Sequence, residues 1–376
     1  MHFIRHFIKY AMPCTLVALC GCSFLNVPQY DAIELDFQPT ALNNEGVIAG
    51  LRVITPNFSE GGLWQDGEFT LLEAPDASPA NPAYANPRFL SDDGVAVGRF
   101  GASSNAPAQV WVDFMVQELP PPSNAPELEL QSIRAMNALG DLAGYALAQG
   151  ELPVPQTVPV VHYADGTAEA LPFFTPPGAA APWRTFVHAL NDEGIAVGSA
   201  APNMTDSMIS YPVIWEDGEV SRLPTPGFLH GSADSVNNLG WVTGSVHNNS
   251  SAWTPNLPFR DVVWIDGRMR QLRLHGASNS GRFILNDNGD ILVNYREDLN
   301  DAGGAPYRVF PVLWRWDELL GRHFPVNLVE PSGLALPEAG NMRGLHMNNA
   351  GQITVAVFVL DEPSVLTEYY LLTPVE

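Results

Sequence analysis

The chain has 376 residues, 46% of them hydrophobic, which is enough for a large core that needs no disulfide. Its 41 acidic residues against 18 Lys and Arg give a formal net charge of −23. That charge argues against nucleic acid as a partner and against adsorption to anionic lipid. All three cysteines lie within the first 22 residues, so we expect no thiolate metal site in the rest of the chain.

Residues 1–21 are predicted to be an export signal. Arg5 and Lys9 form a basic start, and residues 12–19 form an apolar run that is too short to span a bilayer. The sequence Leu19-Cys20-Gly21-Cys22 follows and resembles the lipobox of bacterial lipoproteins. The resemblance implies cleavage before Cys22 and a lipid, such as palmitate, on the thiol of Cys22. An ordinary secreted signal peptide with a stray cysteine is the alternative.

The lipobox sets the predicted organisation of the chain. Residues 22–30 are expected to be the lipidated cysteine and a short tether, and residues 31–376 a single domain. Ser23 after the cysteine implies sorting to the bacterial outer membrane, with the domain either periplasmic or surface-exposed. After cleavage the chain would keep its 41 acidic residues and contain no lysine, since Lys9 is the only one.

A turn motif recurs seven times along the predicted domain. Asn or Ser stands first and Gly fourth, between two apolar runs. In a type I turn the first side chain bonds the backbone and the glycine takes a positive φ, so each copy predicts a β-hairpin. The seven turns are 43–46, 91–94, 137–140, 191–194, 237–240, 286–289 and 348–351.

A second glycine follows four residues later in five copies. Glycine within a strand marks a bulge or a close approach by another group. We expect that group to be a large ring from an adjacent strand. The five glycines are Gly50, Gly98, Gly144, Gly198 and Gly244.

Each unit continues with a second hairpin, as in Trp215-Glu216-Asp217-Gly218, and closes with a short strand ending in Leu-Pro. Four strands in a period of about 40 to 50 residues indicate a blade of a β-propeller. A row of separate small sheets is the alternative, but one such unit cannot bury both of its faces. The last unit lacks a fourth strand, and residues 31–37 precede the first unit as an unassigned strand. The sequence therefore predicts an all-β fold, a seven-bladed β-propeller of four-stranded antiparallel blades. Residues 31–37 would close it by pairing with 366–373.

The repeats resemble a known family. Asn-x-x-Gly-x-x-x-Gly followed by a Trp-x-Asp-Gly hairpin is similar to the HAF repeats of bacterial extracellular proteins, over nearly all of residues 31–376. The His-Ala-Phe of that family is absent, and Tyr211-Pro212-Val213-Ile214-Trp215 stands at the corresponding place. The resemblance implies an exported repeat protein and supplies no catalytic residues.

Loop lengths separate two faces of the predicted ring. The two kinds of turn within the hairpins are short, whereas the connections on the opposite face are long and dissimilar, so we expect ligands on that loop face or at the mouth of the channel. Two residues before the apolar residue that precedes each turn, four successive units carry Arg88, Arg134, His188 and Asp234. Arginine binds carboxylates with two hydrogen bonds, so this series predicts an anion or carbohydrate site. The alternative is that these groups pair with carboxylates of neighbouring blades and hold the ring.

Aromatic residues of the long loops are weaker candidates. They could stack on sugars or anchor a protein partner, or else pack against their own loops. These residues are Trp183, Tyr211, Trp253, Phe259, Tyr295 and Tyr307. The repeated tryptophans, by contrast, are expected to be core: Trp64, Trp111, Trp215, Trp264 and Trp314.

No motif of the sequence predicts a cofactor, a metal site or a catalytic nucleophile. The first hypothesis is a monomeric, non-enzymatic, lipid-anchored propeller that binds an envelope protein or polysaccharide through its loop face. The rival hypothesis is a polysaccharide-cleaving enzyme, which would need two carboxyl groups about 5 to 10 Å apart at the channel mouth. A purely structural envelope component is the third possibility.

Overall fold

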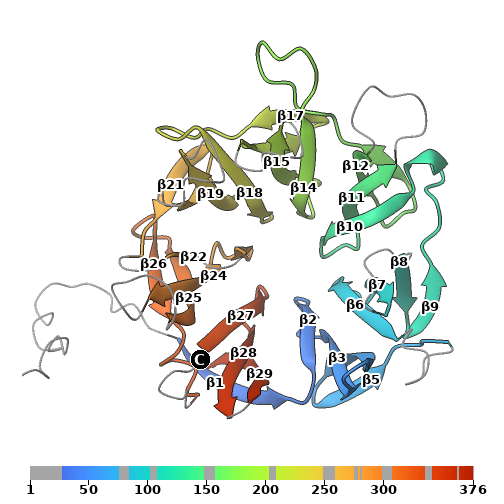
Figure 1. Cartoon of the computed structure of the whole chain (residues 1–376), viewed down its shortest axis with the longest axis vertical. Coiled ribbons are helices and arrows are strands. Elements are labelled where there is room, and N and C mark those ends of the chain that lie inside the picture. The colour runs from blue at the N-terminus through green and yellow to red at the C-terminus, as the bar shows by residue number, and fades with distance from the viewer. Residues whose placement is uncertain are drawn as a thin grey trace, which may run out of the picture.

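Seven β-sheets follow one another around a central axis, and the chain runs once around the ring (Figure 1). The computed structural model describes residues 28–75, 84–101, 108–147, 157–202, 209–248, 259–274, 278–279, 282–298, 307–334, 341–361 and 364–375. Six of the sheets have four antiparallel strands, and the remaining one carries an additional short strand. The predicted seven-bladed propeller is confirmed.

Blades 1 to 6 follow the chain order, and in each the first strand lies nearest the axis (Figure 1). Blade 1 is β2 (Gln38–Leu42), β3 (Ile48–Thr55), β4 (Phe58–Gln65) and β5 (Glu68–Leu71). Blade 2 is β6 (Ala85–Leu90), β7 (Ala96–Phe100), β8 (Ala108–Val112) and β9 (Met115–Glu118). Blade 3 is β10 (Leu130–Met136), β11 (Leu142–Leu147), β12 (Thr157–His162) and β13 (Ala168–Ala170). Blade 4 is β14 (Arg184–Leu190), β15 (Ala196–Ala201), β16 (Tyr211–Glu216) and β17 (Glu219–Arg222). Blade 5 is β18 (His230–Val236), β19 (Val242–His247), β20 (Arg260–Ile265) and β21 (Arg268–Leu272). Blade 6 is β22 (Ser278–Asn279), β23 (Ile284–Leu285), β24 (Ile291–Asp298), β25 (Tyr307–Asp317) and β26 (Arg322–Asn327).

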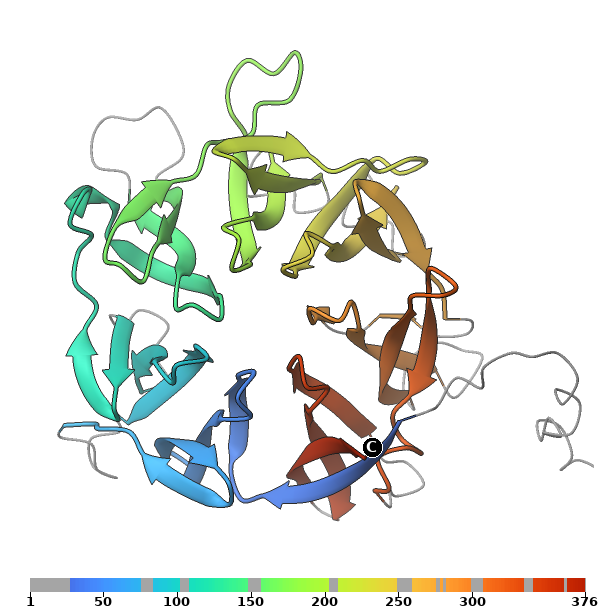
Figure 2. The same cartoon turned by 180° about the vertical axis from the view of Figure 1, so that it is seen from behind.

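Blade 7 joins the two ends of the described chain. It consists of β27 (Asn341–Met347), β28 (Ile353–Asp361), β29 (Ser364–Val375) and β1 (Gln29–Leu35). β1 runs antiparallel to β29 from the pair Gln29–Val375 to the pair Leu35–Tyr369, and Figure 2 shows the blue N-terminal strand beside the red last blade. The pairing therefore covers 29–35 and 369–375, where the sequence suggested 31–37 and 366–373. Phe37 lies beyond the pairing and packs on Phe69, with 4.7 Å between the ring centroids.

The turn asparagines connect neighbouring blades. Asn191 is 3% exposed; its Oδ1 accepts the N–H of Ile195 (2.8 Å), and its Nδ2 donates to the carbonyl of Asn237 in the next blade (2.9 Å). The same side-chain bond to the next turn is made by Asn43, Asn137, Asn237, Asn286 and Asn348. Blade 2 has Ser91, which lacks an amide, and there the backbone N–H of Asp92 donates to the carbonyl of Ala138 (2.9 Å). Every blade is thus bonded to the next one around the channel.

The second turn residues form a parallel set of bonds. The N–H of Asp192 donates to Oδ1 of Asn238 (2.9 Å), and the N–H of Asn238 donates to Oδ1 of Asp287 (2.8 Å). The same bond continues around the ring through Asp287–Asn349, Asn349–Asn44, Asn44–Asp92 and Ala138–Asp192. Because each oxygen accepts a backbone N–H of the preceding turn, these side chains fix how far apart the turns stand.

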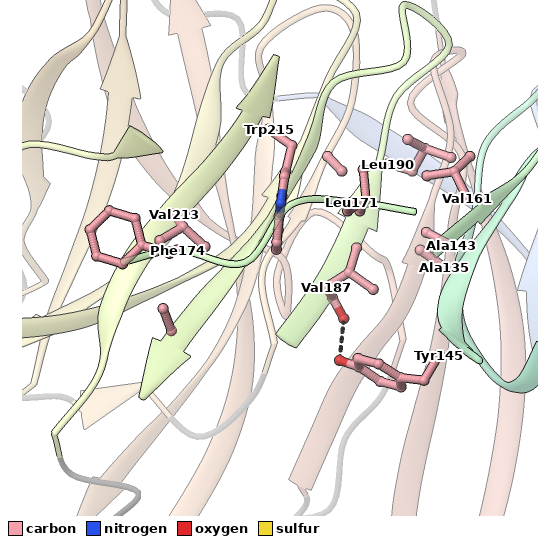
Figure 3. Packing of buried hydrophobic residues seen from close by; sticks show 12 residues of the cluster. Ala135, Ala143, Tyr145, Val161, Leu171, Phe174, Val187, Leu190, Val213 and Trp215 are labelled. Carbon is pink, nitrogen blue, oxygen red and sulfur yellow. Dashed lines mark hydrogen bonds between the residues drawn. The ribbon is translucent and has the colours of Figure 1, made fainter. Parts of the chain in front are cut away.

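Repeated tryptophans connect the blades farther from the axis. The indole N–H of Trp111, Trp215 and Trp264 donates to a carbonyl at the end of the preceding blade, Glu73, Pro172 and Pro224 respectively. Trp111, Trp215, Trp264 and Trp314 are buried as expected, and Trp64 is half-buried. Figure 3 shows the packing between blades 3 and 4, where Tyr145 also donates to the carbonyl of Val187 (3.3 Å).

No helix in the described ranges is long and apolar enough to cross a bilayer. The described helix is one 3₁₀ turn, Pro126–Leu128.

We expect Asn191→Ala to lower the free energy of unfolding by about 1 to 3 kcal/mol, because it removes the acceptor of the Ile195 N–H and the inter-blade hydrogen bond to the carbonyl of Asn237. Ser91→Ala is the matched control: Ser91 accepts the N–H of Val95, and within the described ranges its side chain makes no hydrogen bond to the next blade. Urea unfolding of both variants measures the difference. Equal losses would contradict the inter-blade role of the asparagine.

We expect deletion of residues 29–35 to leave an aggregating chain without a cooperative thermal transition, because β29 would become an exposed edge. Circular dichroism and size-exclusion chromatography would show this. A well-folded monomer after the deletion would rule out closure by β1.

Candidate functional site

Six of the seven innermost strands bulge at the same place. The register of each shifts by one residue there, so that one residue has no partner in the ladder. A bulge re-aims a side chain, and here the side chains belong to the channel wall. The bulged residues are Thr40, Arg88, Arg134, His188, Asp234 and Leu345. The four predicted site residues, Arg88, Arg134, His188 and Asp234, therefore occupy equivalent positions in four successive blades.

The second glycine of the repeat makes this bulge possible. A Cβ on Gly98, Gly144, Gly198 or Gly244 would collide with a backbone carbonyl just before the bulge in the paired strand. The expectation of a large aromatic neighbour is wrong for these four glycines, because the approaching group is the chain itself. Gly50 meets both the ring of Phe37 and the carbonyl of Gln38, so the expectation holds there in part.

Charged side chains surround a cavity of about 300 Å³ on this part of the channel wall. Arg134, His188, Asp234 and Arg282 line it together with Tyr145. The sequence analysis missed Arg282, whose neighbour Phe283 is 5% exposed and belongs to the core.

Three arginines of blades 2 and 3 come close to one another. Burial, followed by the positive charges of Arg88 and Arg134, lowers the pKa of the Arg99 guanidinium from its ordinary value. Arg88 and Arg134 are exposed, and among the described residues no carboxylate forms an ion pair with either. Arg134 lies 5.6 Å from the centroid of the Tyr145 ring, and burial raises the pKa of that phenol to about 12. Like charges are therefore concentrated on one side of the channel.

His188 and Asp234 form a couple across blades 4 and 5. Nδ1 of His188 lies 2.8 Å from the carbonyl of Ala233 and 3.6 Å from Oδ1 of Asp234. Since a carbonyl only accepts, Nδ1 carries a proton and donates it. Ser232 donates to Asp234 (2.8 Å). These contacts match the ring-holding alternative for His188 and Asp234, whereas Arg88 and Arg134 show no such pairing.

The predicted loop aromatics are mostly engaged in packing. Trp183 stacks on Tyr211 at 4.8 Å, and the Arg222 guanidinium lies 3.7 Å from the centroid of the Tyr211 ring. The prediction that Tyr295 lies in a loop is wrong: it belongs to β24, is 2% exposed, and donates to Asp261 (2.8 Å). Because the carboxylate of Asp261 accepts a hydrogen bond from the Tyr295 hydroxyl, the whole side chain can be buried, and its ring is part of the core. Tyr211 and Tyr307 also lie in strands, as the first residues of β16 and β25.

The other predicted residues differ in exposure or lie elsewhere. Phe259 is 50% exposed, with its ring centroid 4.6 Å from that of His247, and Tyr307 is 40% exposed beneath Arg296. Trp253 and Cys22 lie outside the described residues.

No cluster of three or more His, Cys, Asp or Glu side chains suited to a metal ion occurs in the described part of the chain. The described lining of the 300 Å³ cavity holds one carboxylate, that of Asp234.

The fold is that of known propellers. The chain is similar to prolyl oligopeptidase B from Galerina marginata, with a TM-score of 0.50 and 10% identity over 89% of this chain and 48% of that one. It thus spans about half the length of that protein. Other similar structures are the β-propeller domain of the Trilobed protease from Pyrococcus furiosus (TM-score 0.42, 9% identity, 91% and 84% coverage) and an ulvan lyase (TM-score 0.34, 9% identity, 93% and 84% coverage). At such identities the likeness shows the fold alone. No protein-family model matches the chain, and no curated protein matches its sequence.

We expect Arg134→Gln to raise the melting temperature at low ionic strength, because it removes a charge that repels Arg99. Added salt screens such repulsion over about 10 Å at 0.1 M, so the gain shrinks as salt rises. Arg268→Gln, on an exposed outer strand, is the control with the same change of charge. An equal, salt-independent shift in both variants would remove the evidence for repulsion at the mouth.

Proposed function

We propose that this chain is a lipid-anchored propeller of the cell envelope that binds an anionic polymer, either a polysaccharide or an acidic protein segment, at the loop-face mouth of its channel. One observation carries the proposal. Burial lowers the pKa of Arg99, and the neighbouring positive charges of Arg88 and Arg134 lower it further, in a chain whose net charge is −23. Holding like charges together costs free energy, and a bound anion would offset that cost.

The chemistry of these groups favours carboxylates and sulfates. A guanidinium presents paired N–H donors that match two oxygens of such an anion, and it keeps its charge at any physiological pH. Arg282 contributes a further cation to the cavity beside Arg134. Anions spaced along a polymer could then engage the arginines of successive blades.

The cavity supports binding better than cleavage. A polysaccharide-cleaving site of the paired-carboxyl kind needs two carboxyl groups about 5 to 10 Å apart. The described lining supplies Asp234, which accepts a hydrogen bond from Ser232 and lies beside His188. We therefore propose a binding module, acting as a monomer, rather than an enzyme.

The anchor and the family are part of the same proposal. Leu19-Cys20-Gly21-Cys22 supports a lipid at Cys22, and Ser23 supports the outer membrane as the location. The repeated Asn-x-x-Gly-x-x-x-Gly and Trp-x-Asp-Gly motifs support membership of the HAF-repeat family. Labelling of the chain by radioactive palmitate, lost in Cys22→Ser, would test the anchor.

Polysaccharide chromatography tests the binding site. We expect the full chain carrying Cys22→Ser to be retained on dextran sulfate and polygalacturonate columns, to elute with salt, and to pass unretained through neutral dextran. The triple variant with Arg88, Arg99 and Arg134 changed to Gln should lose this retention. The control changes Arg268, Arg273 and Arg322 to Gln, which gives the same net charge with the substitutions on and beside the outer strands. Equal retention of both triple variants would contradict the proposed site.

A further inference from the structure

Spaces between neighbouring blades open on the turn face, the side of the ring that carries the seven Asn/Ser-x-x-Gly turns. In three blades the residue that directly follows the turn glycine reaches across such a space to the turn of the next blade. Cδ1 of Ile195 lies 3.8 Å from the position a Cβ would take on Gly240 of the next blade, and Oε1 of Gln352 lies 3.0 Å from that of Gly46. In these blades this residue fills part of the space between neighbours.

A tryptophan occupies the space between blades 5 and 6. Trp241 follows the turn glycine of blade 5 and contacts Gly289 of blade 6. Its indole packs edge-on against Trp316, with 4.6 Å between centroids. Arg270 lies 5.8 Å from the Trp316 ring and donates to the carbonyl of Gly321 (2.6 Å). An indole and a guanidinium together occupy this space.

The corresponding space between blades 1 and 2 is open. Val47 stands where blade 5 has Trp241, and Thr70 stands where it has Arg270, counted from the glycines that precede them. Both residues are too short to cross the space, and apart from Gly94 and its chain neighbours no atom of the described residues lies within 4 Å of the position that a Cβ on Gly94 would take. A groove of about 610 Å³ results, with Val47, Thr70 and Gly94 in its wall. We call it the blade 1–2 groove.

The charge of the blade 1–2 groove is reversed relative to the filled space. Asp66, Glu68, Asp93 and Asp113 line it, whereas blade 5 has Arg268 at the place of Glu68. Phe114 adds an aromatic ring to the wall and is 41% exposed. The groove thus combines an apolar base with carboxylates at its rim, which are complementary to a cation.

We propose that the blade 1–2 groove docks a segment of a partner protein in which an aromatic residue stands close to an arginine or lysine. The aromatic ring takes the place that Trp241 has between blades 5 and 6, and the cation takes that of Arg270. This site lies on the face opposite the arginines of the channel mouth, and it does not depend on the proposed function.

The test uses a library of displayed 12-residue peptides, selected against the immobilised full chain carrying Cys22→Ser. We expect the selected peptides to contain an aromatic residue within three positions of Arg or Lys. Val47→Trp and Thr70→Arg each restore a filler that blade 5 has, and each should weaken peptide binding about tenfold or more in fluorescence titrations. Ile195→Trp makes a similar change in another inter-blade space and should leave binding unaltered. Melting temperatures would verify that all three variants fold.

Several outcomes would overturn the proposal. Selection of no peptide, or of peptides without the aromatic and basic pair, would remove its chemical basis. Equal affinity for the parent chain and both filled variants would place binding elsewhere. A concentration-dependent dimer in ultracentrifugation that Val47→Trp abolishes would assign the groove to a second copy of the chain. A gain in peptide affinity on removal of residues 1–27 would assign it to the chain's own N-terminal segment.

Discussion

The structure depends on a closed series of hydrogen bonds between the turns that surround the channel. Each first-position asparagine accepts a backbone N–H within its own turn and donates to a carbonyl of the next turn, as Asn191 does with Ile195 and Asn237. Second-position Asn and Asp side chains repeat the connection one residue further along. Buried polar groups of this kind are costly when unpaired, so the ring is favoured only when all blades stand in place.

This constraint has a consequence within the innermost strands, two residues before the end at which each strand enters its turn. Because the turns are fixed relative to one another, the bulges of β6, β10, β14 and β18 stand at a common depth, and with them Arg88, Arg134, His188 and Asp234. The imidazole of His188 in blade 4 lies 3.6 Å from the carboxylate of Asp234 in blade 5, so these two groups pair with each other. Arg88, Arg99 and Arg134 instead raise the positive potential on one side of the mouth. The scaffold thus holds like charges together in a chain whose net charge is strongly negative, an arrangement suited to an anionic ligand.

The fold could be predicted because its signals are local. Asn or Ser first and Gly fourth specify a turn whichever blade carries them, and positive φ values at Gly46, Gly194 and Gly351 bear this out. The second role of the asparagines was missed because only the closed ring brings one turn beside the next. Its signal was present in the choice of residue: a Ser or Asp can accept within the turn, but only the amide also donates N–H groups outward. The glycine of each second strand was recognised as a point of close approach, but the bulge that it faces could not be inferred from one strand alone.

The site was predicted less completely than the fold. The alignment of repeats placed Arg88 and Arg134 correctly on the innermost strands. Arg99 was overlooked because it belongs to the second strand of its blade, and only the folded ring brings it near the other two arginines. Tyr295 was misplaced because a length of chain without a turn motif was taken as loop, although β24 and β25 extend into it. Differences between blades were equally hidden: Val47 and Trp241 occupy the same repeat position, and only the structure shows that one leaves open the space that the other fills.

The most direct test asks whether anions bind at the channel mouth. Crystals of the protein soaked in bromide or selenate would show, by anomalous scattering, where anions gather. The account predicts the strongest peak among Arg88, Arg99 and Arg134, with weaker or no peaks at arginines of the outer strands. An empty mouth whose arginines are paired with carboxylates of the protein would contradict it, and those residues would then serve to hold the ring.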